Sequence, residues 1–240
     1  MPSVVRPAKI IVITIIIGAM SAMAVPIGYA RECSGHSDEP LVQILSAPPC
    51  QSCEETRAEL DELADLEKSR TPEQTQHARD DVERSLGRFL SGAGIGFDAA
   101  ELNECEPFFI SRRKEEKAIV GAAKDRFCRL RPFLTPGNDL HPVNGAKPDD
   151  SFSYPSGHAT FGATVGLLLA DMLPEKKADI YKRIADYGFS RMVAGVHFRS
   201  DVEAGKILGA AIAASLFADP AFRDEFVLAK ACVRKAVGLP

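Results

Sequence analysis

One short stretch, Ser153 to His158 with the sequence SYPSGH, combines residue types suited to binding an anion. It leads directly into an apolar run, Ala159 to Leu173. Proline and small residues before such a run predict a helix start, because proline's fixed φ and missing N–H suit the first turn. The first N–H groups of a helix lack partners within it and can hold a phosphate, which Gly157 lets approach closely. His158 adds a side chain that titrates near neutral pH.

A second stretch carries two cations. Lys124 and Arg131 are separated by seven positions, which is close to two helical turns, so both fall on one face near the end of a helix. Taken alone, these residues are better explained as part of a solvated basic face, since Arg126 and Arg129 lie between them. Lys124 and Arg131 indicate a binding site only in combination with the other two stretches.

The third stretch joins Ser190 and Arg191 to His197 and Asp201. A histidine four residues before an aspartate is usually an incidental surface pair. In a phosphate site, however, the aspartate can accept one ring N–H, which fixes the tautomer and leaves the other nitrogen free to act as a nucleophile.

In order, the three stretches read Lys-x6-Arg-Pro, Pro-Ser-Gly-His and Ser-Arg-x5-His-x3-Asp. This arrangement resembles the signature shared by the type 2 phosphatidic acid phosphatases and the vanadium haloperoxidases. The matching positions are Lys124, Arg131, Pro132, Pro155, Ser156, Gly157, His158, Ser190, Arg191, His197 and Asp201.

The chain is most similar to the bacterial class A non-specific acid phosphatases, whose pattern Tyr154 and the segment 200–202 also match. The similarity extends from about Glu39 to Ala231. The stretch from Thr71 to Leu102, where those enzymes place part of the pocket rim, matches only loosely. Substrate preference is therefore the property that the resemblance determines least.

The residue types also suit phosphate chemistry in their own right. A phosphomonoester is a dianion, so its transferring group must be clamped and its developing charge stabilised. Lys124 supplies a point charge, and Arg131 and Arg191 supply planar forks that match phosphate oxygens. Ser156 and the N–H groups around Gly157 complete the predicted phosphate cradle. Because three cations can neutralise the phosphate, we expect neither a metal nor another cofactor.

The two histidines are predicted to divide the work. We expect His197 to be the nucleophile, with Asp201 stabilising the cationic phosphohistidine. His158 is expected to protonate the leaving alcohol and then to take a proton from the attacking water. The resemblance implies the same roles. Ser200 to Glu203 has the form of a capping box, which predicts a helix start there and places Asp201 in its first turn.

Three other functions compete with a phosphomonoesterase. A vanadium haloperoxidase would use the same cradle for vanadate, but this chain is short for that group. A membrane-associated phosphatase of lipids or undecaprenyl pyrophosphate gains support if the N-terminal segment stays as an anchor. A non-catalytic phosphate-binding protein would leave His158, His197 and Asp201 without a task.

The composition is that of one folded domain. The chain has 240 residues, of which 45% are apolar and 26% charged, and its net charge is −4. A mildly acidic chain has no broad basic surface, so we expect a small phosphomonoester as the partner rather than nucleic acid. A homo-oligomer is compatible with these features.

The N-terminal residues have the form of an export signal. Arg6 and Lys9 precede an apolar stretch, and small residues follow. We expect residues 1–24 to be a signal peptide, with cleavage possible as late as residue 30, and residues 31–240 to form a single helical domain in the periplasm or outside the cell. An uncleaved anchor is the alternative, because residues 10–30 are long enough to span a bilayer.

All six cysteines lie beyond the signal peptide, and an even number in an exported protein predicts disulfides. Cys50 and Cys53 form a Cys-x-x-Cys motif, for which we expect a structural role. No strand–helix–strand pattern supports a redox role for the pair, and no second cysteine pair supports a zinc site.

The periodicity predicts an all-α, compact multi-helix domain of the acid phosphatase and vanadium haloperoxidase type. Gly92 to Gly96 is expected to be a break and Phe133 to Tyr154 a long loop. The expected helices cover residues 54–69, residues from 72 onward, 113–130, 155–173, 175–194, 200–217 and 220–237. Helical signals also resume at Asp98, ahead of the longer helix at 113–130.

Overall fold

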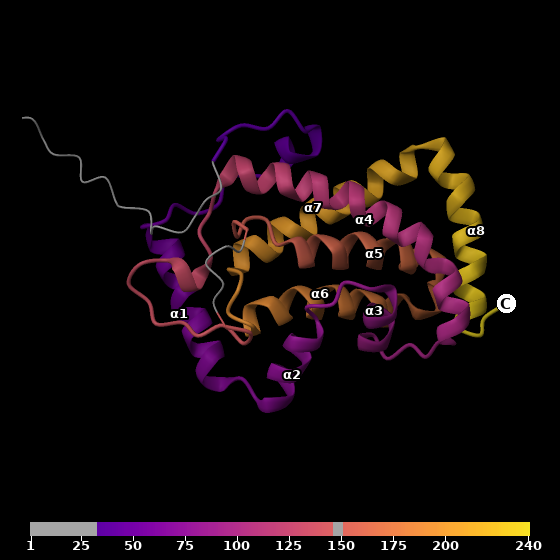
Figure 1. The fold of residues 1–240 in the computed structure, drawn as a ribbon, viewed down its shortest axis with the longest axis horizontal. Helices are drawn as coiled ribbons and strands as arrows, with labels where there is room; N and C mark the ends of the chain where they lie inside the picture. Colours follow the sequence, from indigo (N-terminus) through magenta and orange to yellow (C-terminus); the bar gives the residue numbers. More distant parts are fainter. Residues whose placement is uncertain (1–32, 146–150) are drawn as a thin grey trace, which may run out of the picture.

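The computed structural model describes residues 33–145 and 151–240, and every regular element in these ranges is helical (Figure 1). The prediction of an all-α fold is confirmed. The predicted signal peptide lies outside the described residues. The α-helices are α1 (Glu54–Ser69), α2 (Pro72–Asp80), α3 (Leu86–Gly92), α4 (Ala99–Phe127), α5 (Gly157–Met172), α6 (Lys177–Val193), α7 (Arg199–Ala218) and α8 (Pro220–Ala236). Short 3-10 helices are η1 (Pro40–Ile44), η2 (Pro132–Leu134) and η3 (Pro174–Lys176).

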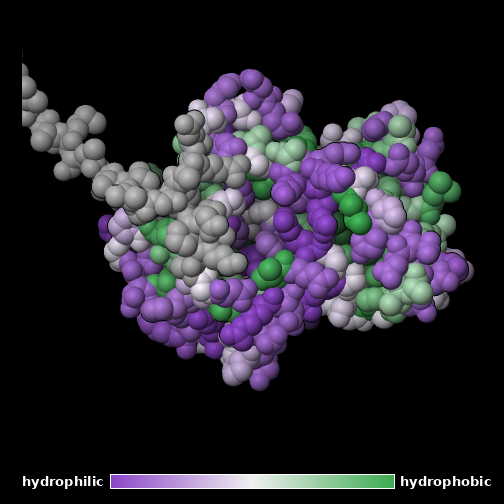
Figure 2. All heavy atoms as spheres, in the orientation of Figure 1, coloured by the Kyte–Doolittle hydropathy of each residue, from purple (hydrophilic) through white to green (hydrophobic). Residues whose placement is uncertain are grey.

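Helix α5 is the centre of the fold. It packs against α7 and α6, and it also touches α4, which runs beside α8 (Figure 1). Nearly all of its side chains are buried, as expected for a helix that is apolar on every side. The visible face of the molecule is largely hydrophilic, and hydrophobic residues are more frequent towards the α8 end (Figure 2).

The backbones of α5 and α7 approach each other closely where the two helices begin. A Cβ atom at Gly205 would lie 2.5 Å from the carbonyl oxygen of Ser156, and one at Gly209 would lie 2.5 Å from that of Thr160. Only glycine allows such an approach. The Ser156 N–H donates to the Asp201 carbonyl oxygen over 2.9 Å, so the two helix starts are joined directly.

Several predicted helix starts are confirmed, and those of α2 and α8 have the side-chain caps that the sequence predicts. Helix α1 has the predicted bounds, Glu54–Ser69. Thr71 and Gln74 form a reciprocal capping box at the start of α2, and the Asp219 side chain accepts from the Ala221 N–H at the start of α8.

Several boundaries differ from the prediction. The helix expected from residue 72 onward is divided into α2 and α3, α4 ends at Phe127 rather than residue 130, and α6 begins at Lys177 rather than residue 175.

The helical signals expected from Asp98 are confirmed, because its side chain caps α4 by accepting from the Glu101 N–H at 3.0 Å. The longer helix expected from Arg113 is continuous with this start, so α4 runs unbroken from Ala99. Pro107 lies inside this helix without ending it, since the residues around it are packed against α8.

The starts of α5 and α7 are also displaced slightly. Pro155 precedes α5, and Ser156 is its N-cap. Helix α7 begins at Arg199 rather than Ser200, because the Asp201 carboxylate accepts from the Phe198 N–H at 2.8 Å.

Disulfides join Cys33 to Cys128 and Cys105 to Cys232, which confirms disulfide formation for four of the six cysteines. The second bond ties α4 to α8. Cys50 and Cys53 are not bonded to each other, and the Cys53 thiol donates to the Cys50 carbonyl oxygen at 2.8 Å.

The contact between α5 and α7 leads to a stability prediction. Gly205→Ala should lower the free energy of unfolding by about 1–3 kcal/mol, because the added methyl group cannot fit against Ser156 without moving a helix. Gly121→Ala is the matched control, since nothing lies within 4 Å of a Cβ at that position of α4. It should raise stability by up to about 1 kcal/mol. Urea unfolding of both variants measures this, and equal effects would contradict the close contact.

Candidate active site

A pocket of about 240 Å³ opens at the starts of α5 and α7. It brings together five of the eight residues that the sequence assigned to the site, and no carboxylate is found among the described residues that line it. Ser156 and Arg191 are buried beside the pocket rather than lining it. The lining residues are Arg84, Lys117, Val120, Gly121, Lys124, Arg131, Ser151, Gly157, His158 and His197.

The geometry around His197 defines the protonation of its ring. Arg131 Nη1 lies 2.8 Å from His197 Nε2. A guanidinium can only donate, so Nε2 carries a lone pair and the neutral ring holds its proton on Nδ1. His197 Nδ1 lies 3.4 Å from Asp201 Oδ2, which can accept that proton's hydrogen bond. The unprotonated nitrogen is therefore the one that lies beside Arg131.

Asp201 is fully buried and accepts from several donors besides His197. The hydroxyl of Ser153 and the backbone N–H of Phe198 donate to Oδ2, and Arg129 Nη1 donates to Oδ1 at 2.8 Å. A buried carboxylate is stabilised as an anion by such hydrogen bonds. Asp201 is thus held in one orientation before any ligand binds.

Arg129 connects this carboxylate to α1. Its Nη2 atom donates to Glu59 Oε2 at 2.7 Å, and its guanidinium lies over the ring of Phe198. Glu59 also accepts from the Ser200 N–H at 2.6 Å. The result is a row of alternating charges from Glu59 through Arg129 to Asp201. The sequence analysis treated Arg129 as part of a solvated face and missed its role in this row.

Two cations in the pocket were also missed because they lie outside the matched motifs. Arg84 is in the connection between α2 and α3, and Lys117 precedes Lys124 by two turns of α4. A methyl group at Gly157 would lie 3.6 Å from Arg84 Nη1, which places the guanidinium beside the start of α5. The loose match of residues 71–102 gave no signal for Arg84.

Backbone carbonyl groups orient the other basic side chains. Lys124 Nζ donates to the Phe152 carbonyl oxygen. Arg131 donates to the carbonyl oxygens of Ser151 and Val196, each at 2.8 Å. Arg191 donates to the Ala78 carbonyl oxygen. Burial lowers the pKa of Arg191 to about 10, so it stays charged near neutral pH.

Both histidines are shifted towards the neutral form. Burial lowers the pKa of His197 well below its usual range, and the charges of Arg131 and Lys124 lower it further. Burial also lowers the pKa of His158, with Arg191 and Arg84 adding to the effect. His158 Nε2 lies 3.1 Å from the Val82 carbonyl oxygen, which can only accept, so this nitrogen carries a proton. Nδ1 is therefore the nitrogen of His158 that remains for a hydrogen bond to a ligand.

These shifts predict how stability depends on pH. A histidine whose pKa is lowered on folding contributes stability above its unfolded pKa of about 6.5, and the contribution is lost as pH falls. The free energy of unfolding should therefore decrease below about pH 6.5, by up to about 1.4 kcal/mol per pH unit for each histidine. His158→Asn should flatten this slope, whereas the exposed His36→Asn should not change it. Equal slopes in both variants would contradict the assignment.

Arg84 should contribute to anion binding. Arg84→Ala should weaken the binding of inorganic phosphate on the order of tenfold, which corresponds to about 1.4 kcal/mol for one lost charge contact. Lys114→Ala is the matched control. It also removes one positive charge, but Lys114 is exposed and does not line the pocket, so phosphate binding should change less than twofold. Isothermal titration calorimetry provides the comparison, and identical affinities in the two variants would contradict a role for Arg84.

Comparison with known proteins adds independent support for the domain type. Residues 116–224 match the PAP2 superfamily. An acid phosphatase from Zymomonas mobilis subsp. mobilis is 34% identical over 166 residues, which make up 68% of this chain and 62% of that protein. A non-specific acid phosphatase from Salmonella typhimurium is 35% identical over 110 residues, covering 43% of this chain and 42% of that protein. The chain thus spans less than two thirds of the length of these curated relatives.

A solved structure shares the fold. The transmembrane PAP2 type phosphatidylglycerolphosphate phosphatase from Bacillus subtilis superposes with a TM-score of 0.51, over 77% of this chain and 91% of that chain, at 22% sequence identity. The matched segment 116–224 contains every motif position from Lys124 to Asp201. This chain therefore carries a domain of the PAP2 superfamily.

Proposed function

We propose that this protein is an acid phosphatase that hydrolyses phosphate monoesters through a phosphohistidine on His197, without a metal. One observation carries the proposal: the His197 Nε2 lone pair lies in a pocket of cations, while Asp201 lies against the opposite ring nitrogen. The similarity to acid phosphatases supports the same activity.

The first step transfers the phosphoryl group to the enzyme. His197 Nε2 attacks phosphorus, and the bond from phosphorus to the ester oxygen breaks. The ester oxygen takes a proton from His158 and leaves as an alcohol. As the His197 ring becomes cationic, its Nδ1–H bond to Asp201 strengthens, which stabilises the intermediate. Arg131 Nη1 donates to Nε2 in the structure, so this donor must turn to a phosphoryl oxygen when Nε2 bonds to phosphorus.

The second step releases phosphate. Neutral His158 takes a proton from water while the water oxygen attacks phosphorus, and the bond from phosphorus to nitrogen breaks. The electron pair returns to His197 Nε2. Lys124, Arg131 and Arg84 offset the charge on the phosphoryl oxygens in both steps, and Arg191 adds to the positive potential from its buried position.

The electrostatics favour activity at acidic pH. The pKa of His158 is lowered by burial and by the nearby charges of Arg191 and Arg84. A bound phosphate group offsets those charges and raises the pKa again. Because the first step needs protonated His158, its rate should increase as pH falls through the pKa of the bound state.

We also propose that the protein is exported to the periplasm or beyond the cell. The N-terminal sequence supports export, and disulfides are typical of oxidising compartments. Among the described helices, none alone is long and apolar enough to cross a membrane. The pair α7 and α8, bent by 101°, meets the test by length and composition only.

Hydrolysis assays test the proposed chemistry. Wild-type protein should hydrolyse p-nitrophenyl phosphate in excess EDTA and lose activity with vanadate, which mimics the five-coordinate transition state. His158→Ala should reduce hydrolysis of glycerol phosphate on the order of a hundredfold, because an alkoxide is a poor leaving group without a proton donor. It should reduce hydrolysis of p-nitrophenyl phosphate much less, since nitrophenolate leaves readily.

The control for these assays is His36→Ala, which removes an exposed histidine outside the pocket and should retain wild-type rates. Activity that is lost in EDTA and restored by a divalent metal would overturn the metal-independent mechanism. Bromide oxidation by the vanadate-loaded protein, in place of ester hydrolysis, would point instead to a haloperoxidase.

A further inference from the structure

The segment from Ala78 to Glu83, called here the carbonyl segment, joins the end of α2 to the residues before α3 and provides acceptors to the active site. Its Val82 carbonyl oxygen lies 3.1 Å from His158 Nε2. Its Ala78 carbonyl oxygen accepts from Arg191 Nη2. The orientation of two proposed site residues therefore depends on where this segment lies.

Tyr187 on α6 adds a third connection. Its hydroxyl group donates to the Glu83 carbonyl oxygen, and its ring stacks on the His158 ring with centroids 6.3 Å apart. Burial raises the pKa of Tyr187, so the hydroxyl keeps its proton and remains a donor. His158 is thus held between a ring of α6 and a carbonyl group of the carbonyl segment.

Asp81 attaches the carbonyl segment to α6. Its carboxylate is fully buried and accepts from Arg183 Nη2 at 2.6 Å and Nη1 at 3.0 Å. Arg88 Nε donates to the same carboxylate at 2.7 Å. Burial alone would raise the pKa of Asp81, but the hydrogen bonds and charge of Arg183, together with His77 and Arg88, hold it below its usual value. The carboxylate is therefore a fixed anion.

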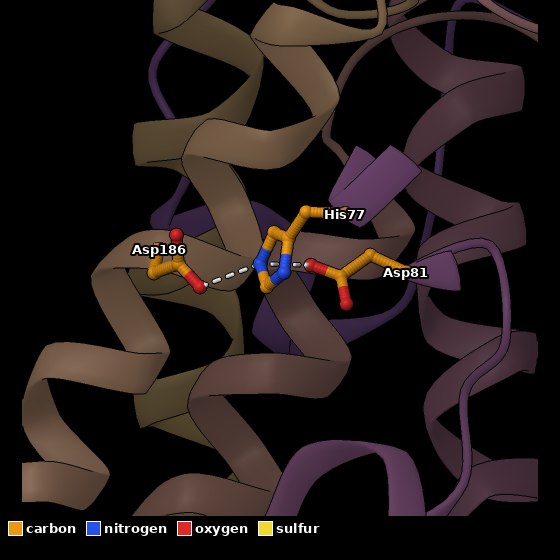
Figure 3. Close-up of side chains that lie close together, drawn as sticks. All are labelled: His77, Asp81 and Asp186. Atoms are coloured by element: carbon orange, nitrogen blue, oxygen red, sulfur yellow. Dashed lines mark hydrogen bonds and ion pairs between the residues drawn. The ribbon is translucent and has the colours of Figure 1, made fainter. Parts of the chain in front are cut away.

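His77 and Asp186 complete this cluster (Figure 3). His77 Nε2 lies 2.9 Å from Asp186 Oδ2 and 3.3 Å from Asp81 Oδ2. The grouping has the composition of a metal site, but the guanidinium groups of Arg183 and Arg88 lie 3.1 Å and 3.2 Å from the two nitrogens of the His77 ring. Two cations already compensate the two carboxylates, so the cluster is an ion-pair network that fixes backbone rather than a cation site.

We infer that Asp81 is a positioning residue for catalysis, acting through the Val82 carbonyl group on His158 and through the Ala78 carbonyl group on Arg191. The inference rests on the proposed function, because it assigns Asp81 a part in placing the proton donor of that reaction. Loss of the Asp81 charge would release the carbonyl segment from α6, and displacement of a catalytic group by about 1 Å can cost about a hundredfold in rate.

The test compares Asp81→Asn with Asp80→Asn. Asp80 is the adjacent residue and is exposed, and among the described contacts its carboxylate accepts only from Gln76. Asp81→Asn should lower kcat for glycerol phosphate about tenfold or more and lower kcat for p-nitrophenyl phosphate several-fold less, since His158 is needed most for poor leaving groups. Asp80→Asn should stay within about twofold of wild type on both esters.

A double-mutant cycle separates positioning from general destabilisation. If Asp81 acts through His158, then Asp81→Asn should cost much less in a His158→Ala background than in wild type. If Asp81→Asn does not fold, Arg88→Gln serves in its place, because it removes one donor to Asp81 while both Arg183 bonds remain. Its effect should show the same dependence on leaving group.

Equal losses on both esters, additive effects in the cycle, or an Asp81→Asn variant that matches Asp80→Asn would overturn the inference while leaving the proposed function intact. A wild-type protein that hydrolyses neither ester would overturn the proposed function, and the inference with it. Leaving-group dependence together with non-additivity supports the inference.

Discussion

The backbones of α5 and α7 touch where both helices begin, because Gly205 leaves no side chain between them. This contact places the Ser156 N–H on the Asp201 carbonyl oxygen, and it brings the start of α5 and His197, which precedes α7, to one pocket. Residues separated widely in sequence thereby become neighbours. The pocket depends on this approach, since a displaced α7 would carry His197 and Asp201 away from Gly157.

The cations around His158 and His197 repel one another, and two buried carboxylates outside the pocket lining, Asp201 and Asp81, lie among them. The burial of the Asp201 carboxylate is compensated by hydrogen bonds from Arg129, Ser153 and the Phe198 N–H. Asp81 is held in the same way by Arg183 and Arg88. The carboxylates of Asp81 and Asp201 thus orient residues of the site without lining the pocket. The pocket surface formed by the described residues therefore carries no negative charge that would repel a phosphate.

The helical fold and most motif positions could be predicted from sequence because their signals are local. Caps such as Thr71 and Asp219 act within one helical turn. The apolar run after Gly157 predicts a helix that is buried on all sides, as α5 is. The parts that could not be predicted depend on tertiary contacts. Nothing near Arg129 in the chain reveals Glu59 as its partner, and the connection between α2 and α3 becomes part of the site only because α6 binds it. The continuous α4 was missed for the same reason, since packing on α8 stabilises it across Pro107.

The central claim is that phosphate is transferred to His197, and trapping the phosphoenzyme tests it most directly. Wild-type protein mixed with labelled substrate, quenched in alkali to preserve the acid-labile phosphohistidine, and mapped by mass spectrometry should carry the label on His197. His197→Ala should carry none, and Asp201→Asn should carry less, because loss of the carboxylate removes the partner that stabilises the cationic ring. Label on His158 or on any serine or cysteine, or turnover by the His197→Ala variant at the wild-type rate, would contradict the account.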